Sequence, residues 1–270
     1  MENLLEIKNF SVSYPRDKGV FKALSNIELS IQNGESVGIV GESGSGKSTM
    51  ALGILGLLPL LGAKTTGDIF FQGEDISHLP KDKMRKMRGE KVSLIFQNPL
   101  MSLDPLYNIG NQFTEFLKAH QHILSADVNE IISRSLVHAQ LPSDKKFLKL
   151  YPHQFSGGML QRVSIAMATA LRPKLLIADE PTSSLDVTTQ AEIVSLLKRL
   201  CLEQKMSLVF ISHDLALVSQ LCDRIYILKE GHVIESGTTE NIFLRPQNPY
   251  TKKLITAIPQ IEVRGYNPKR

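Results

Sequence analysis

A glycine-rich stretch with a lysine follows an apolar run near the N-terminus, where residues 37–49 read VGIVGESGSGKST. The spacing from Gly41 to Ser48 fits G-x-x-x-x-G-K-[ST] between a predicted strand and a predicted helix. Glycines let backbone N–H groups turn toward phosphate oxygens, and the N-terminus of the next helix attracts negative charge. The pattern predicts a nucleotide-binding loop rather than an unliganded glycine turn. The residues expected to contact the nucleotide are Gly41, Glu42, Ser43, Gly44, Ser45, Gly46, Lys47, Ser48 and Thr49.

Two adjacent carboxylates, Asp179 and Glu180, end a second apolar run, LLIADE. Neighbouring side chains on a strand point to opposite sides, so one carboxylate can bind a metal ion while the other serves an attacking water molecule. A solvated strand end is the alternative interpretation. Because the same chain carries a phosphate-binding pattern, we expect the pair to act on the nucleotide.

Hydrophobic periodicity indicates the elements that must position these residues. Three alternating segments predict half-buried strands: LLEIKNF, NIELSI and DIFFQGEDI. More continuous runs predict strands buried on both faces, as in a mostly parallel sheet: SVGIVG, VSLIFQ, LLIADE, LVFISH and RIYILK. The stretch 98–172 lacks such runs and predicts helices with breaks near Pro105, Pro142 and Pro152. We expect it to be a helical insertion between two sheet strands.

Composition limits the class of protein. A chain of 270 residues, 42% of them hydrophobic, is long enough for one large domain or two with a packed core. The net charge of +4 comes from interspersed Lys and Arg, so an anionic partner and a merely solvated basic surface both remain open. Cys201 and Cys222 have no CxxC pair or histidine cluster near them, which predicts a reducing compartment and no disulfide framework.

Two segments bear on a membrane location. The N-terminal MENLLEIKNF carries Glu2, Glu6 and Lys8 where a signal peptide would be apolar, so we do not expect secretion. The longest apolar stretch, 50–63, is shorter than the roughly 20 apolar residues of a membrane span and contains Pro59. We expect a chain that stays in the cytoplasm and does not cross a bilayer.

The segment FSGGMLQR lies between Gln97 of LIFQNP and the carboxylate pair, and with these motifs the chain resembles the ABC transporter ATPase family. An SGG triplet alone is most often a flexible turn. In the family, this signature loop of one subunit closes over the γ-phosphate bound by the other subunit. The resemblance therefore implies that Ser156, Gly157 and Gly158 contact ATP held by a partner.

Other positions match the same family one by one. Tyr14 in SVSYP corresponds to the aromatic residue that stacks on adenine, and Asp186 in SSLD belongs to the D-loop. The resemblance implies that Gln97 touches Mg²⁺ or water, that Glu180 polarises the water and that His213 in ISHD contacts the γ-phosphate. Each residue alone could be a packing residue or a strand end, but their order along the chain favours the functional interpretation. The cofactors implied are ATP and Mg²⁺, with Ser48, Gln97 and Asp179 as metal ligands.

The resemblance also implies the fold. We expect an α/β protein with a P-loop ABC ATPase core around a mostly parallel sheet, an N-terminal antiparallel β subdomain and a helical insertion subdomain. Residues 1–260 would form a single nucleotide-binding domain, with the helical subdomain at 98–172 and a short tail at 261–270. Some members carry a cysteine cluster in the tail for an iron–sulfur centre; this tail has none, so no cluster is expected.

Longer runs look like the dipeptide, oligopeptide and nickel importer branch: IFQNPLMSLDP, YPHQFSGGMLQRVSIAMA, RPKLLIADEPTSSLDVTTQAEI and NPYTKKLITAIP. They are closer to the D-type subunit than to its F-type partner. The resemblance implies a non-identical second ATPase subunit, two permease subunits, an extracytoplasmic solute-binding protein and a peripheral position on the cytoplasmic face of the inner membrane. Nucleic acid is not expected as a partner. Within the insertion, Tyr107 and Phe113 are candidates for gripping a permease helix, although they could instead fill the insertion's own core.

Other functions of the same family remain as alternatives. An ABC ATPase can drive export or act on DNA or ribosomes, but the chain shows no fused membrane segment, long coiled coil or second cassette. Glu180 and His213 are both present, which favours hydrolysis over mere binding. The cargo, whether peptides or nickel complexes, is left open.

Overall fold

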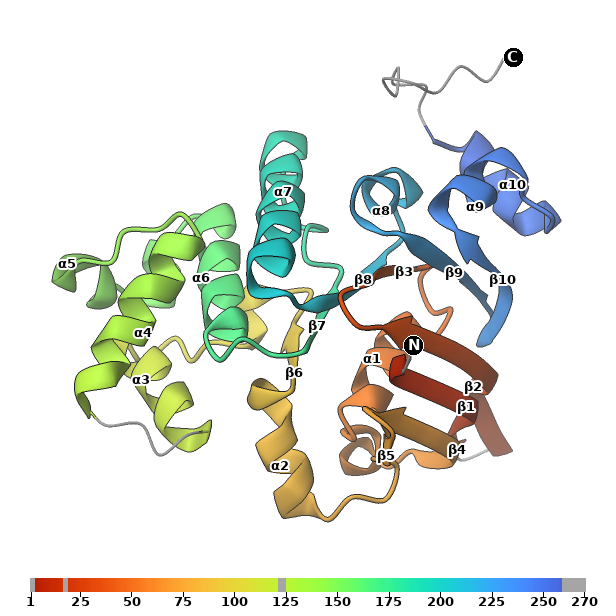
Figure 1. Ribbon diagram of the computed structural model, residues 1–270, viewed down its shortest axis with the longest axis horizontal. Helices are drawn as coiled ribbons and strands as arrows, with labels where there is room; N and C mark the ends of the chain where they lie inside the picture. The colour runs from red at the N-terminus through yellow and green to blue at the C-terminus, as the bar shows by residue number, and fades with distance from the viewer. Residues whose placement is uncertain (1–2, 17–18, 121–124, 259–270) are drawn as a thin grey trace.

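A computed structural model describes residues 3–16, 19–120 and 125–258 (Figure 1). Within them, one sheet is entirely antiparallel, with the strand order β2-β1-β4-β5. Its strands are β1 (Asn3–Arg16), β2 (Gly19–Gln32), β4 (Lys64–Phe71) and β5 (Glu74–Asp75). This sheet confirms the expected N-terminal antiparallel unit. The tail at 261–270, and with it the expectation of no iron–sulfur cluster, lies outside the described residues.

The second sheet has the order β10-β9-β3-β8-β7-β6, and all its neighbours are parallel except β10 and β9. Its strands are β3 (Ser36–Val40), β6 (Val92–Ile95), β7 (Leu175–Asp179), β8 (Ser207–Ser212), β9 (Arg224–Lys229) and β10 (His232–Thr238). Strands β3, β7 and β8 are buried on both faces, which explains their continuous apolar runs. Parallel strands end at one edge of a sheet, so the loops after β3, β6, β7 and β8 meet there.

Two hydrophobic cores lie on the two faces of this sheet. Alternate residues of β7 supply them: Leu175 and Ile177 face the core shared with the antiparallel sheet, whereas Leu176 and Ala178 face the other core. The helices of the first core are α1 (Lys47–Ile54), α2 (Lys81–Glu90) and the 3₁₀ turn η1 (Leu58–Leu61). The second core packs α7 (Val187–Gln204), α8 (Leu215–Leu221), α9 (Thr239–Leu244) and α10 (Pro249–Thr256). The arrangement confirms the expected α/β class.

Strand β10 was not predicted from the sequence. Its residues are half-buried or exposed, and it forms the antiparallel edge of the sheet beside β9. An edge strand with a wet face buries few apolar side chains, so HVIESGT has neither a continuous apolar run nor a clear alternation.

The segment between β6 and β7 is helical, as predicted. It contains η2 (Pro99–Met101), α3 (Ile109–His120), α4 (Ser125–His138), α5 (Lys145–Leu148), η3 (Pro152–Gln154) and α6 (Gly157–Thr169). Its own core includes Ile109, Phe113 and Leu117, which recur every four residues on one face of α3 and are fully buried. The expectation that Phe113 contacts a permease is therefore wrong, because that ring fills the insertion's core. Tyr107, by contrast, is 54% exposed.

Helix α6 belongs to two cores at once. Leu160, Val163 and Ala166 pack in the core of the helical segment, while Ile165 and Ala168 pack against the parallel sheet. In Figure 1, α6 stands between α4 and α7. The helical segment is thus joined to the sheet through a shared helix rather than through loops alone.

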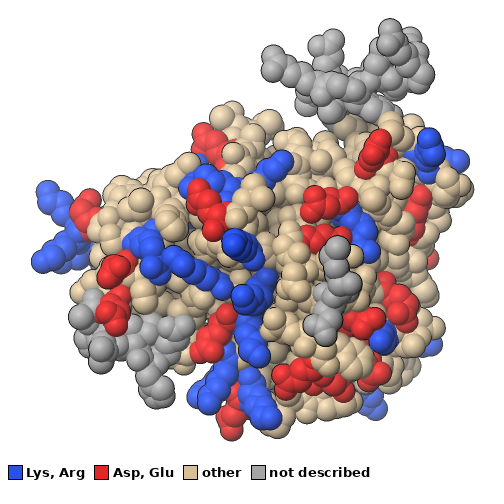
Figure 2. All heavy atoms as spheres, in the orientation of Figure 1, with Lys and Arg blue, Asp and Glu red and all other residues tan. Residues whose placement is uncertain are grey.

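Surface charge is mixed over most of the visible face, but Lys and Arg gather over α2 at its lower edge (Figure 2). On that helix Lys81, Lys83, Arg85 and Lys86 are exposed, whereas Met84 and Met87 are buried. None of the described helices is both long and apolar enough to cross a membrane.

Both cysteines are free and buried. Burial raises the pKa of the Cys201 thiol to about 12 and also raises the pKa of Cys222. Two inert thiols agree with the prediction that these residues form no disulfide framework.

Candidate active site

The glycine-rich loop joins the end of β3 to the start of α1, as its sequence predicts. Gly46 has φ of 105°, and a Cβ at this position would lie 2.5 Å from the Leu24 side chain and 2.8 Å from the Ala23 carbonyl oxygen. A Cβ on Gly41 would meet the Leu228 carbonyl oxygen at 2.2 Å. Both positions therefore need glycine, since the loop is packed against strands β2 and β9.

Lys47 lies under this loop with 5% of its surface exposed. Its Nζ donates hydrogen bonds to the carbonyl oxygens of Gly41 (2.8 Å) and Glu42 (2.9 Å), and it lies 3.8 Å from Oε1 of Glu180. Burial lowers the pKa of Lys47, while the charges of Glu180 and Asp179 act in the opposite direction. The lysine is thus a buried cation held at the base of the loop.

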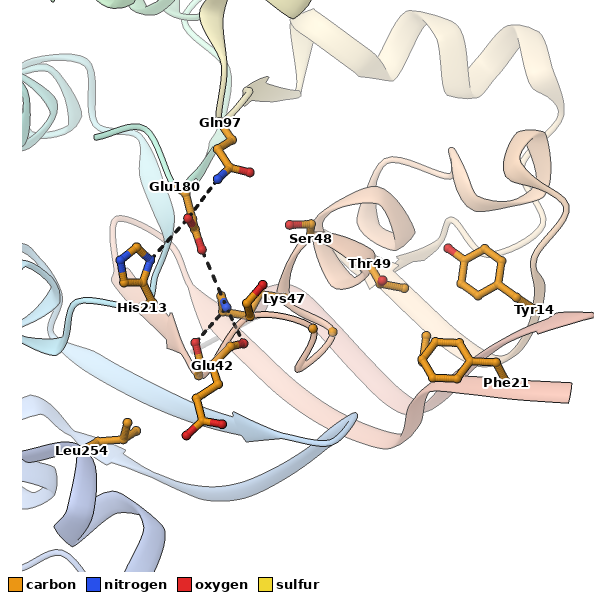
Figure 3. Close-up of a pocket in the computed structure, with 15 residues that line it drawn as sticks. Tyr14, Phe21, Glu42, Lys47, Ser48, Thr49, Gln97, Glu180, His213 and Leu254 are labelled. Atoms are coloured by element: carbon orange, nitrogen blue, oxygen red, sulfur yellow. Dashed lines mark hydrogen bonds and ion pairs between the residues drawn. The ribbon is translucent and has the colours of Figure 1, made fainter. Parts of the chain in front are cut away.

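Glu180 lies where the loops after β6, β7 and β8 meet. It directly follows β7 with φ of 45°, and its backbone N–H donates to the Ile211 carbonyl of β8 at 2.9 Å. Gln97, after β6, donates from Nε2 to Oε2 of Glu180 at 3.1 Å. Nδ1 of His213, after β8, lies 3.4 Å from the same oxygen. Figure 3 shows Gln97 and His213 on either side of the carboxylate, with Lys47 facing it from the loop.

Asp179, the last residue of β7, lies directly before Glu180 in the chain and is partly buried. Burial raises its pKa, and a hydrogen bond with Ser48 acts in the opposite direction. Its Oδ1 is buried and has no hydrogen-bond partner among the described residues. An orphaned carboxylate oxygen beside a serine hydroxyl and a phosphate-binding loop fits Mg²⁺, which takes oxygen ligands from one or two side chains and from phosphates. The set Ser48, Asp179 and Gln97 therefore suits the expected metal.

Apart from Asp179, the site residues described above line a cleft of about 760 Å³. Its lining contains Tyr14, Phe21, Ala23, Gly41, Glu42, Ser43, Gly44, Gly46, Lys47, Ser48, Thr49, Gln97, Glu180, His213 and Leu254. Ser45 was expected here but is buried outside the lining, where its N–H donates to the Glu42 carbonyl at 3.2 Å.

The end of the cleft away from Glu180 is aromatic. Tyr14 of β1 and Phe21 of β2 are paired across the hairpin, and in Figure 3 both rings point toward Thr49. The guanidinium carbon of Arg16 lies 4.3 Å from the centroid of the Phe21 ring. Sequence reasoning found Tyr14 and missed Phe21. The hairpin register that brings the two together could have pointed to it.

The predicted signature and D-loop residues do not line this cleft. Ser156 caps α6 by accepting from the Met159 N–H at 3.3 Å, and Gly157 and Gly158 open that helix. Asp186 caps α7 and accepts from the Thr189 N–H at 3.0 Å. The structure accounts for these residues as helix starts within the chain. Their expected contacts with a partner's nucleotide stay a prediction.

A further contact comes from the C-terminal part of the chain, to which sequence reasoning assigned no role. Leu254 of α10 lines the cleft, and the hydroxyl of Tyr250 accepts a hydrogen bond from the Glu42 N–H at 3.2 Å. Both residues lie within NPYTKKLITAIP, which resembles the importer branch. That resemblance did not indicate that the segment contacts the glycine-rich loop.

Comparison with known proteins agrees with this geometry. Residues 24–183 match the family described as ABC transporter, and residues 234–268 match the family described as oligopeptide/dipeptide transporter, C-terminal region. The oligopeptide transport ATP-binding protein OppD of Escherichia coli K12 is 42% identical over 262 residues, covering 97% of this chain and 77% of OppD. The peptidoglycan transport ATP-binding protein YejF of Agrobacterium fabrum is 44% identical, covering 96% of this chain and 48% of YejF.

Solved structures give the same result. The ATP-binding cassette MJ0796, in a dimeric post-hydrolysis state with ADP and Pi, has a TM-score of 0.74 and 32% identity over 87% of this chain and 98% of that chain. The cbiO1 protein of Clostridium perfringens, part of the ABC transporter complex cbiONQ, has a TM-score of 0.77 and 26% identity over 96% of this chain and 97% of that chain.

Proposed function

The chain belongs to the ABC transporter family, and from this premise we propose that it hydrolyses ATP to drive the import of peptides through a membrane permease. The observation that carries the proposal is a single cleft that combines the glycine-rich loop with the Glu180 cluster. The names of OppD and YejF, together with the match at 234–268, support peptides as the cargo class. The nickel complexes that the sequence left open have no such support among these relatives.

The cleft residues divide the work between the base, the phosphates and the water. Tyr14 stacks on adenine, the loop N–H groups bind phosphate oxygens, and Lys47 offsets charge on the terminal phosphates. Mg²⁺, when bound, supplies further charge neutralisation and would be held by Ser48, Asp179 and Gln97. Glu180 accepts a proton from the attacking water. Gln97 and His213 hold the Glu180 carboxylate in place, and His213 also contacts the γ-phosphate when ATP is bound.

One observation on this cleft supports a second ATPase subunit. Ser156, Gly157, Gly158 and Asp186 lie outside the chain's own cleft, which supports their use at the site of a second ATPase subunit. We propose a non-identical F-type partner, two permease subunits and a solute-binding protein, with the assembly on the cytoplasmic face of the inner membrane. Residues 1–260 act as one nucleotide-binding domain, in which the helical subdomain at 98–172 faces the permease and presents Tyr107.

The test uses the complex that co-purifies with the tagged chain, reconstituted in liposomes with its binding protein. We expect ATP hydrolysis and uptake to rise together when the binding protein carries peptides of a suitable length. If only nickel chelates stimulate ATP hydrolysis and uptake, the cargo would be nickel complexes and not peptides. Hydrolysis that drives outward transport, or none at all, would overturn the importer assignment.

A further inference from the structure

We infer that helix α10 positions the phosphate-binding loop, with Tyr250 as a positioning residue that fixes the place of Lys47. The inference rests on the assignment of the cleft as the ATP site. It adds a residue 208 positions away from the loop to the determinants of nucleotide affinity.

One peptide unit of the loop is held by hydrogen bonds at both of its ends. The hydroxyl of Tyr250 accepts from the Glu42 N–H at 3.2 Å, and Nζ of Lys47 donates to the Gly41 carbonyl oxygen at 2.8 Å. This N–H and this carbonyl are the two ends of the same planar peptide group. If the plane rotates, both ends move together. Tyr250 therefore holds the plane that holds the ammonium group of Lys47.

The tyrosine is itself fixed. It is 9% exposed, and Nζ of Lys229 lies 5.0 Å from the centroid of its ring. The chain just before it is tied to β10, because the Glu235 carboxylate accepts from the N–H groups of Gln247 (2.7 Å) and Asn248 (3.0 Å). Asn248 then caps α10 by accepting from the Tyr250 N–H at 2.9 Å. These contacts fix the position of the Tyr250 hydroxyl relative to β10.

The next turn of α10 reaches the cleft directly. Leu254 follows Tyr250 by four residues and so lies on the same face of the helix. It lines the cleft, and Figure 3 shows it beside Glu42, on the side of the loop away from Tyr14 and Phe21. One face of α10 therefore both holds the loop and forms part of the wall of the nucleotide cleft.

The test is Tyr250→Phe in the full chain, which removes the hydroxyl and keeps the buried ring. Loss of one hydrogen bond of this kind changes an equilibrium constant about fivefold. We therefore expect about fivefold weaker ATP binding in a titration with a fluorescent ATP analogue. The matched control is Tyr226→Phe. Tyr226 is also buried, also accepts a backbone N–H (Ser30, 3.1 Å) and also lies beside a cation, Arg224 at 5.4 Å, but it does not line the cleft. The control should lower the melting temperature without changing ATP affinity.

A second measurement separates positioning from general destabilisation. If Tyr250 acts through the lysine, Tyr250→Phe should have little further effect on ATP affinity in a Lys47→Ala background. The inference is overturned if Tyr250→Phe binds ATP like the wild type while Lys47→Ala still weakens binding, or if the two effects simply add. If Lys47→Ala itself leaves ATP affinity unchanged, the assignment of the ATP site has failed instead.

Discussion

At the scale of single residues, the site is a set of charges held close together by backbone geometry. Glu180 sits at φ of 45°, a conformation that costs a residue with a side chain about 1–2 kcal/mol, and its N–H bond to Ile211 helps to hold it there. The strained turn places its carboxylate 3.8 Å from Lys47 and within contact of Gln97 and His213. Motif chemistry predicted Lys47 and Glu180, whereas Gln97 and His213 were predicted from the order of motifs in the family that the chain resembles. The sequence could not predict the strain.

Glu180→Gln tests the proton-accepting role. The amide keeps the size of the side chain but cannot take a proton, so we expect ATP to remain bound while hydrolysis by the reconstituted complex falls at least about 100-fold. Phosphate release and ATP titration measure the two effects separately. Glu240→Gln, an exposed glutamate in the first turn of α9, is the control and should hydrolyse normally. Near-normal turnover of the Glu180 variant would remove it from this role.

At the scale of elements, the sequence predicted the strands that are buried on both faces, but it did not predict the edge strand β10. β3, β7 and β8 are buried throughout, so their apolar runs are continuous, whereas β10 is an edge strand with a weak pattern. The sequence left open whether Phe113 contacts a permease or fills the insertion's core, because the residue type alone does not show what covers an apolar ring. The structure places it in the core. Phe21 was missed because its importance comes from pairing with Tyr14 across a hairpin.

Phe21→Ala tests whether the hairpin contributes to binding of the base. The ring lies beside Tyr14 at the aromatic end of the cleft, and loss of one aromatic contact with a base costs about 1 kcal/mol, or roughly fivefold in affinity. We expect weaker binding of ATP and unchanged binding of inorganic tripolyphosphate, which has no base. Val20→Ala, the preceding residue on the opposite face of β2 and 67% exposed, should change neither. Equal losses for ATP and tripolyphosphate would contradict a contact with the base.

At the scale of the whole molecule, the predicted site residues lie in two places. The cleft holds Lys47 and Glu180, while Ser156 and Asp186 start helices elsewhere in the chain. The order of these motifs in the sequence predicted that the cleft residues and the helix-start residues serve the same ATPase reaction. Their separation in space is what makes a second subunit necessary for the proposed mechanism.

A concentration series measures this dependence. Phosphate release by the isolated chain should be slow and should rise more steeply than in proportion to protein concentration, because two subunits must meet to complete a site. Addition of the partner ATPase and the permease should raise the rate and make it sensitive to loaded binding protein. Full turnover by a dilute monomer, indifferent to these additions, would exclude a shared site.

The contact between Tyr250 and Glu42 also has a consequence for the order in which the protein is made. The two residues are 208 positions apart, and chains grow at about 5–20 residues per second, so the loop emerges about 10–40 s before Tyr250 is made. Strand β3 likewise waits for β8 and β9, which are made long after it. Nascent chains therefore carry a complete nucleotide-binding motif without a finished binding site. Full ATP affinity therefore depends on residues that are synthesised long after the loop itself.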